Sequence, residues 1–328
     1  MIRTMYRPPE GRVRTGLSLE EVGTLLREGG GVLWVDFEGE PDQAAEPVLR
    51  QTFGFHPLAV DDALVESHVP KVDDWDDYLY VVLHEVDFET ESRTLRSDEL
   101  DSFLGKSFLV THHDRPLRSL SRVWDRCTRN DERPLRAGAD HLFYQIVDEV
   151  VAATMPVVEA MDEELDRIED QILGDPSPHI VERIFTLKRS MLQLRRTLGP
   201  EREVVNKLAR DEYDVIDRWD RVYFRDVYDH LVRLHDINES LRDQASSALE
   251  TYLSAINNRL NEVLKTLTII TTLFMPASFV ASFFGMNIFL ASTPLDVSVG
   301  TPWMVAGLAA MILTPLGIYV WVRRRGWI

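Results

Sequence analysis

The stretch from Thr266 to Phe284 reads TLTIITTLFMPASFVASFF and carries no charged residue. A second stretch, Pro302–Val322, reads PWMVAGLAAMILTPLGIYVWV and is also uncharged. As helices at ~1.5 Å per residue, each is about 30 Å long, which matches the hydrocarbon core of a bilayer. Two buried helices of a soluble core are the alternative, but such helices normally keep a charged stripe. The sequence therefore predicts two membrane spans.

Basic residues flank the two spans on one side only. Lys265 precedes the first span and Arg323–Arg325 follow the second, whereas the connecting loop 285–301 has no Lys or Arg and one acid, Asp296. By the positive-inside rule, both termini are cytoplasmic and the loop is external. The N-terminus has no apolar stretch typical of a cleaved signal peptide. We expect a multi-pass protein of the cell (inner) membrane.

The remainder of the sequence is strongly acidic. The 328 residues hold 36 Lys and Arg against 54 Asp and Glu, a formal net charge of −18. One acid and three bases lie after residue 265, so the first 265 residues hold 53 acids and 33 bases. This excess argues against binding of nucleic acid and permits a cation-handling protein. The single cysteine, Cys127, excludes an internal disulfide and a thiolate metal cluster.

Residues 1–136 mix strand and helix patterns. Aromatic and β-branched runs predict three strands, at 31–37, 78–88 and within 100–111. Helices are expected at 18–27, 56–66 and 117–129. The first of them opens with a capping pattern, Ser18 followed by Glu21. Together these elements indicate a cytoplasmic α/β domain with a mixed sheet.

Strand patterns stop after about residue 136, and residues 137–222 have the pattern of a helical hairpin arm. Asp140–Ile172 is expected to be one long helix with a kink at Pro156. The sequence GDPSP at 174–178 predicts a turn. Ile180–Leu198 is the returning helix.

A stalk helix is expected over 223–265, continuous with the first span at 266–287. Between Arg225 and Phe284 the sequence has no glycine and one proline, Pro276. Apolar residues on this helix follow heptad spacing: Leu249, Leu253, Ile256, Leu260, Val263 and Leu267. A lone helix cannot bury that stripe, so self-association is expected.

Another face of the same helix is largely polar where it crosses the membrane. Steps of three and four residues back from Gly285 pass through hydroxyl residues and reach two asparagines. Several copies of this face around a water-filled path would line a pore. The candidate pore-lining residues are Asn257, Asn261, Leu264, Leu267, Thr271, Met275 and Ser278. Close packing of small hydroxyl residues between helices is the alternative.

The first span ends in FFGMN, with Gly285, Met286 and Asn287 at its outer end. An external loop (288–301), a second span (302–322) and a basic tail, RRRGWI (323–328), follow. This arrangement resembles the CorA-type magnesium transporters. The resemblance extends to FGFHPLAVDDAL at 53–64, PKVDDWDDYLYVVL at 70–83, YFRDVYDH at 223–230 and NEVLKTLTIITTLFMP at 261–276. It implies a funnel-shaped homo-oligomer, a pentamer, around the first-span helices.

The resemblance also implies where cations bind. Gly285, Met286 and Asn287 match the selectivity filter, whose neutral oxygens would hold hydrated Mg²⁺. Regulatory Mg²⁺ would bind between subunits and keep the pore closed, and the matching acids are Asp61, Asp62, Asp226 and Asp229. Mg²⁺ is thus expected as substrate and regulatory ligand, with no catalytic cofactor. The expected partners are further copies of the chain, the lipid bilayer and divalent cations.

The expected function is passive influx of Mg²⁺ and Co²⁺, driven by the membrane potential and gated by intracellular Mg²⁺. The sequence departs from the family in the external loop, where 288–294 lacks the usual acids and only Asp296 is acidic. A Zn²⁺, Co²⁺ or Ni²⁺ transporter of the same superfamily is therefore an alternative. The proposed pore face has no Cys or His, which favours a hard cation.

A membrane-anchored sensor or scaffold without a pore is a more remote alternative, and an enzyme is not expected. The chain has no Walker A pattern. His112 and His113 are adjacent in an expected strand, so their rings point to opposite faces. No motif surrounds Cys127.

Overall fold

The computed structural model describes residues 1–65, 69–129, 133–285 and 301–326. The chain divides into two compact units, Met1–Thr251 and Tyr252–Ile328. The first unit contains the expected α/β domain, the helical arm and the beginning of the stalk helix. The second contains the rest of that helix and the second apolar helix.

Within the described residues, the first unit is built on a seven-stranded sheet of order β2-β1-β3-β7-β6-β5-β4. The strands are β1 (Ile2–Arg7), β2 (Arg14–Thr15), β3 (Val32–Glu38), β4 (Lys71–Asp74), β5 (Tyr78–Glu89), β6 (Thr94–Gly105) and β7 (Phe108–His113). β3 and β7 pair in parallel, and the other neighbours are antiparallel. The predicted mixed sheet is confirmed.

The single strand expected within 100–111 is wrong, because the chain reverses there. β6 ends at Gly105 and β7 begins at Phe108, so that Leu104 pairs with Leu109. A Cβ atom at position 105 would collide with the Phe108 ring, and glycine is therefore needed at this tight turn. The apolar residues on both sides of the turn form a nearly continuous run in the sequence, which hides the hairpin.

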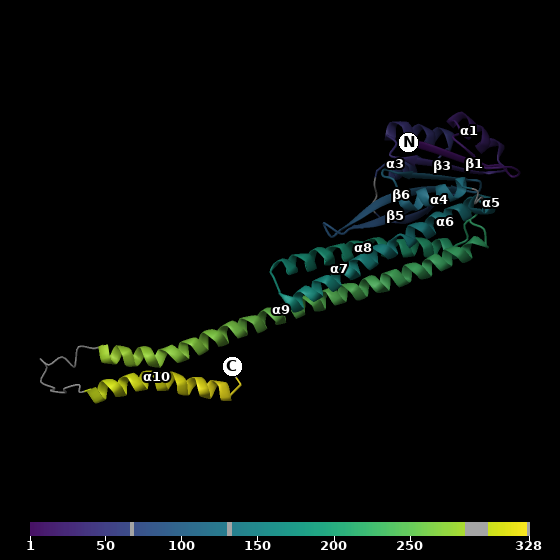
Figure 1. The fold of residues 1–328 in the computed structure, drawn as a ribbon. Helices are drawn as coiled ribbons and strands as arrows, with labels where there is room; N and C mark the ends of the chain where they lie inside the picture. The colour runs from purple at the N-terminus through teal and green to yellow at the C-terminus, as the bar shows by residue number, and fades with distance from the viewer. Residues whose placement is uncertain (66–68, 130–132, 286–300, 327–328) are drawn as a thin grey trace. The chain divides into compact units, whose positions relative to one another are not determined.

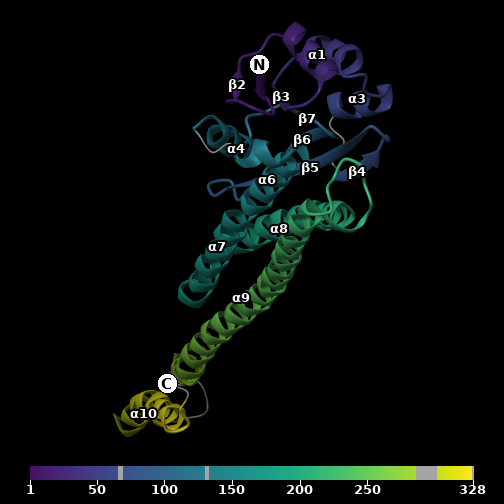
Figure 2. The same ribbon diagram turned by 90° about the vertical axis from the view of Figure 1, so that its right-hand side faces the viewer.

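Helices cover both faces of the sheet (Figures 1 and 2). One face carries α1 (Leu19–Glu28), α2 (Asp42–Pro47), the π-helical turn η1 (Val48–Thr52) and α3 (Pro57–Leu64). Val22 of α1 and Val60 of α3 belong to the same buried cluster as Val35 and Phe103 of the sheet. On the other face, α4 (Arg118–Thr128) places Trp124 with its ring 5.0 Å from that of Trp34. The predicted capping box at Ser18 and Glu21 is present at the start of α1.

The arm also differs from its prediction. After α5 (Arg133–Ala137), the helix expected from Asp140 to Ile172 is two helices, α6 (Ala139–Ala152) and α7 (Thr154–Gly174). Pro156 lies in the first turn of α7, where its missing N–H removes no bond within the helix. The helix therefore breaks at Ala153, before the proline. α8 (His179–Arg210) is the returning helix and continues through Pro200.

The expected stalk and first span form one helix, α9 (Asp220–Gly285), of 66 residues. Within the first unit, α9 packs beside α8, where the Asn238 amide donates to the carbonyl oxygen of Met191 at 3.1 Å. Lys188 Nζ lies 2.9 Å from Ser246 Oγ in the same seam. The second apolar helix is α10 (Thr301–Arg324).

Candidate functional site

The described part of the chain has two helices that are long and apolar enough to cross a membrane, one within Asp220–Phe283 and one at Val305–Arg324. The most apolar window of α9 has no buried residue, unlike a core helix of a soluble protein. Leu260, Leu267 and Phe274 are all more than half exposed on a single chain. These surfaces need lipid or further protein to cover them.

All seven candidate pore-lining residues lie on α9 and are exposed in the single chain. The helical spacing assumed from the sequence is therefore present. The Thr271 hydroxyl donates to the carbonyl oxygen of Leu267 at 2.9 Å, and that of Thr268 donates to Leu264 at 2.7 Å. Each hydroxyl oxygen keeps lone pairs that can accept a hydrogen bond from the water shell of an ion. Whether these residues line a pore stays a prediction.

Of the three filter residues, Gly285 is the last residue of α9. Met286 and Asn287 lie outside the described residues, as do most of the external loop and the end of the basic tail. The filter therefore also stays a prediction.

The two acids on α3 are paired with cations of their own domain. Arg50 donates to Oδ1 of Asp61 at 2.5 Å, and the Lys71 ammonium forms an ion pair with Asp62. Lys71 also lies 3.0 Å from Asp73. Burial alone would lower the pKa of Lys71, but the two carboxylates outweigh it and raise that pKa. A divalent ion at Asp62 would therefore compete with Lys71.

Asp226 and Asp229 lie on exposed positions near the start of α9. Burial raises the pKa of Asp148 on α6, and the charges of Glu149 and Asp226 add to this effect. Among the described residues, the four predicted regulatory acids do not form a metal-binding group within one chain. An arrangement between subunits stays a prediction.

A buried charged cluster on β3 and β7 was not predicted. Asp36, Glu38 and His113 bring their ligand atoms within 4.8 Å of one another, a spacing that would suit a metal. However, Arg3 Nε donates to Asp36 at 2.9 Å, and Nδ1 of His113 is already bonded to the carbonyl oxygen of Arg115. The guanidinium occupies the place of a cation, so this cluster is a salt-bridge network. An acid inside an otherwise apolar strand, GVLWVDF, was the available signal.

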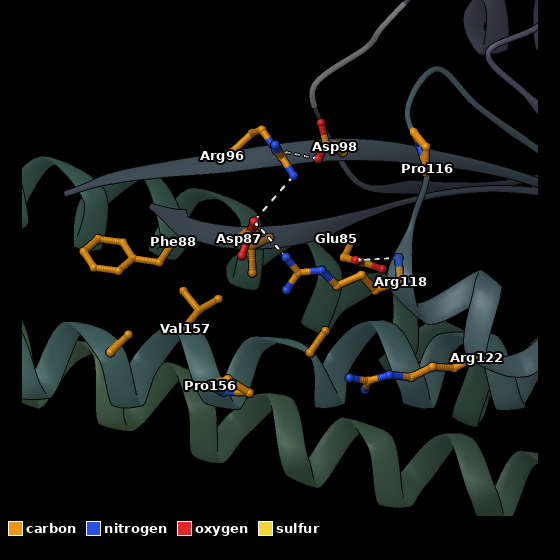
Figure 3. A pocket seen from close by; sticks show the side chains of 13 residues that line it. Glu85, Asp87, Phe88, Arg96, Asp98, Pro116, Arg118, Arg122, Pro156 and Val157 are labelled. Atoms are coloured by element: carbon orange, nitrogen blue, oxygen red, sulfur yellow. Dashed lines mark hydrogen bonds and ion pairs between the residues drawn. The ribbon is translucent and has the colours of Figure 1, made fainter. Parts of the chain in front are cut away.

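A cavity of about 250 Å³ lies between β5, β6, the start of α4 and α7, and Figure 3 shows the side chains that line it. The Glu85 carboxylate accepts from the backbone N–H groups of Arg118 and Ser119 at 3.0 and 2.9 Å, and thereby caps α4. Arg96 and Arg118 both reach Asp87, at 3.5 and 3.7 Å. Because its charged groups already serve caps and ion pairs, the cavity presents no nucleophile with an adjacent base.

A soluble α/β unit followed by two exposed apolar helices of bilayer length defines a membrane protein of the two-span class. Within this class, the sequence matches the model of the CorA-like Mg²⁺ transporter protein over residues 29–324, and the chain belongs to that family. The family predicted from the Gly-Met-Asn motif is confirmed, and it is a family of transporters, not of enzymes.

Individual relatives agree with this assignment. The chain is 32% identical over 305 residues to the cobalt/magnesium transport protein CorA of Thermotoga maritima, covering 92% of this chain and 85% of that protein. Its fold is similar to the complete structure of the CorA magnesium transporter from Methanocaldococcus jannaschii, with a TM-score of 0.82 at 21% identity, covering 99% and 98% of the two chains. Full-length CmaX is also similar, with a TM-score of 0.71 at 22% identity, covering 98% and 96%.

Proposed function

We propose that this protein is a channel for passive influx of Mg²⁺, and also of Co²⁺, driven by the membrane potential. Family membership and the cobalt/magnesium transport relative support this function. The observation that carries the proposal is the unbroken α9, whose exposed face bears asparagines below a series of hydroxyls. Moving two charges through ~100 mV releases about 4–5 kcal/mol, so ATP is not required.

Two spans of one chain cannot enclose a water-filled path, so the channel must be an oligomer. The exposed apolar stripe on α9, which includes Leu253, Leu260 and Val263, supports self-association. We propose a homopentamer with the α9 helices around the pore. Both termini are cytoplasmic, as the basic residues in the last turn of α10 suggest, and the protein resides in the cell (inner) membrane.

In this assembly, Mg²⁺ meets neutral oxygens first. The Asn287 amide and the backbone carbonyls of Gly285 and Met286 would accept hydrogen bonds from the hydration shell of the ion, which Mg²⁺ gives up reluctantly. Further in, Ser278 and Thr271 would pass on the hydrated ion. Rings of Met275 and Leu264 would narrow the path and gate it by dewetting.

Intracellular Mg²⁺ would regulate this path through acids between subunits. Asp61 and Asp62 of one subunit would face Asp226 and Asp229 of its neighbour, and bound Mg²⁺ would neutralise their repulsion and hold the closed form. Within each chain, Arg50 pairs with Asp61 and Lys71 pairs with Asp62, so these two side chains compete with Mg²⁺ for the carboxylates. Such competition would set the concentration at which Mg²⁺ closes the channel.

The test is ion flux into liposomes that hold the purified protein. We expect Mg²⁺ uptake that follows an imposed inside-negative potential and is lost in Asn287→Ala. Asn258→Ala changes an exposed asparagine next to the proposed pore stripe and should leave flux unchanged. Zn²⁺ flux without Mg²⁺ flux would instead assign a transition-metal transporter. A protein that carries no ion under any of these conditions would be a sensor or scaffold.

A further inference from the structure

Two histidine–carboxylate pairs lie buried on the face of the sheet that α3 covers. His84 of β5 stands directly opposite Glu99 of β6, and Asp101 of β6 stands opposite His112 of β7. Glu99 and Asp101 are two residues apart and therefore share this face. His84, Asp101 and His112 are each 3% exposed and Glu99 is 7% exposed, so all four titratable groups are shielded from solvent.

The imidazoles of these pairs are not hydrogen-bonded. His84 Nε2 lies 3.5 Å from Oε2 of Glu99, and His112 Nδ1 lies 3.8 Å from Oδ2 of Asp101. Within the described part of the chain, neither ring nitrogen of either histidine has a hydrogen-bond partner. A buried polar group without a partner costs about 1–3 kcal/mol, and two such imidazoles in one place therefore call for an occupant.

A small cavity adjoins the cluster. It measures about 20 Å³ and is lined by Glu99, Asp101 and His112 from the sheet, together with Ala63 and Leu64 of α3. That volume accommodates one water-sized occupant. The lining also includes Asp114 and Arg115, which are exposed, so the cavity has a route to the surface.

The electrostatic environment of this cavity favours a cation. Glu99 and Asp101 bring two carboxylates to one buried face, where the Tyr80 hydroxyl donates to Oδ1 of Asp101 at 2.5 Å. A cation between the two carboxylates would remove their repulsion. On the opposite face, the Arg3 guanidinium supplies the positive charge beside Asp36. The ion pairs around Asp101, in contrast, involve only histidine.

We propose that His84, Glu99, Asp101 and His112 bind one divalent transition-metal ion of the Zn²⁺ or Co²⁺ type inside the cytoplasmic domain. Imidazole together with carboxylate suits these ions, whereas Mg²⁺ prefers oxygen ligands alone. Bonds of about 2.0–2.1 Å in a tetrahedral site place neighbouring ligand atoms roughly 3.3 Å apart. The pair distances of 3.5 and 3.8 Å are close to that spacing.

Binding requires the side chains of the cluster to rearrange. In the structure, no three ligand atoms of this cluster lie within 4.8 Å of one another. The Glu99 and Asp101 carboxylates must turn toward each other to place both pairs on one ion, and their like charges oppose this turn until a cation arrives. The site is separate from the proposed ion path and does not depend on the channel function.

The test uses the full-length protein in detergent, with excess Mg²⁺ present to fill sites made only of oxygen ligands. Co²⁺ is then titrated, and the visible absorption that marks four-coordinate nitrogen and oxygen ligation is recorded. We expect one Co²⁺ per chain with this absorption, displaced by Zn²⁺. His84→Gln and His112→Gln should each weaken binding by at least about tenfold. The matched control, His179→Gln, changes an exposed histidine and should bind as wild type does.

A measurement on the wild-type protein alone protects the test against variants that fail to fold. After incubation with Zn²⁺ and gel filtration in Mg²⁺ buffer, the metal content should be one Zn²⁺ per chain. Absence of retained Zn²⁺, or Co²⁺ binding that neither His84→Gln nor His112→Gln changes, would overturn the proposal. Neither result would bear on Mg²⁺ flux, which is measured in liposomes.

Discussion

His113 and Asp36 form a buried ion pair in which Nε2 of the imidazole lies 3.1 Å from Oδ1 of the carboxylate. The other ring nitrogen, Nδ1, lies 2.6 Å from the carbonyl oxygen of Arg115. Because both nitrogens face oxygen acceptors, both carry a proton, and His113 is an imidazolium in the folded protein. Arg3 and the Thr111 hydroxyl complete the shell of Asp36.

This pair predicts a specific dependence of stability on pH. Burial alone would lower the pKa of His113, but the hydrogen bond and charge of Asp36 outweigh it and raise that pKa. The stabilisation is therefore full below the unfolded pKa of about 6.5 and is lost as pH rises through the folded-state pKa. Thermal melts over this range should show the loss in wild type and in His179→Gln but not in His113→Gln. Asp36→Asn should cost about 3–5 kcal/mol at neutral pH, and an unchanged Tm would refute the role of the pair.

Glu201 of α8 predicts a second effect of pH. Its carboxylate accepts from the backbone N–H of His84 at 2.9 Å, and burial raises its pKa to about 7. Stability from this group is full below the unfolded pKa of about 4.3 and is lost as pH rises to about 7. Glu201→Gln keeps an acceptor and removes the charge, so it should gain up to about 3 kcal/mol on wild type between those limits. Urea unfolding at both ends of the range would measure this gain.

The control for Glu201 is Glu203→Gln, an exposed acid on the same helix. It should follow wild type at every pH. An equal gain in both variants would trace the effect to net charge rather than to the buried position of Glu201.

Lys71 offers a test of the regulatory acids. Its ammonium pairs with Asp62, so Lys71→Met should free that carboxylate for Mg²⁺. A partly exposed pair is worth about 0.3–1 kcal/mol, which corresponds to roughly a two- to fivefold lower internal Mg²⁺ concentration for half-inhibition of flux. Lys106→Met removes a more exposed lysine and should leave the inhibition of flux by internal Mg²⁺ unchanged. The double variant Asp62→Ala with Asp226→Ala should need a higher internal Mg²⁺ concentration for half-inhibition. Identical inhibition curves for all variants would exclude Asp62 as a ligand.

The apolar stripe on α9 predicts a change in assembly. Leu260 is 54% exposed on the single chain, and burying one leucine contributes about 1.5–3 kcal/mol. Leu260→Glu should therefore shift the detergent-solubilised protein toward smaller species in light scattering. Asn258→Glu places the same charge two residues away, off the stripe, and should retain the wild-type mass. If both variants had the same mass, the apolar stripe would not be part of the interface between subunits.

Patterns with a strong local signal were predictable. The long α9 and the spans follow from uninterrupted helical sequence without charge, and β3 and β5 follow from aromatic and β-branched runs. β1 (IRTMYR) and β4 (KVDD) mix charged with apolar residues and show no clear strand pattern, and both pair with neighbouring strands in the sheet. Tertiary pairing of this kind leaves no local pattern to detect.

The site residues divide in the same way. The helical spacing of Asn257, Thr271 and Ser278 could be predicted from the sequence, because one helix positions all of them. The partners of Asp62 and of His84 could not. Lys71 of β4 meets Asp62 of α3 through the packing of a helix beside a strand, and Glu99 stands opposite His84 through strand register. Sequence spacing alone does not specify which residues of two strands stand opposite each other.

The continuity of the unit Met1–Thr251 along the chain has a consequence for biosynthesis. Every strand of the described sheet is present once His113 has been made, and α6, α7 and α8 follow before the apolar part of α9. Translation adds ~5–20 residues per second, so the sheet and its helices have seconds in which to fold before the first hydrophobic segment is complete. The unit Met1–Thr251 can therefore reach its folded form before both apolar helices have been made.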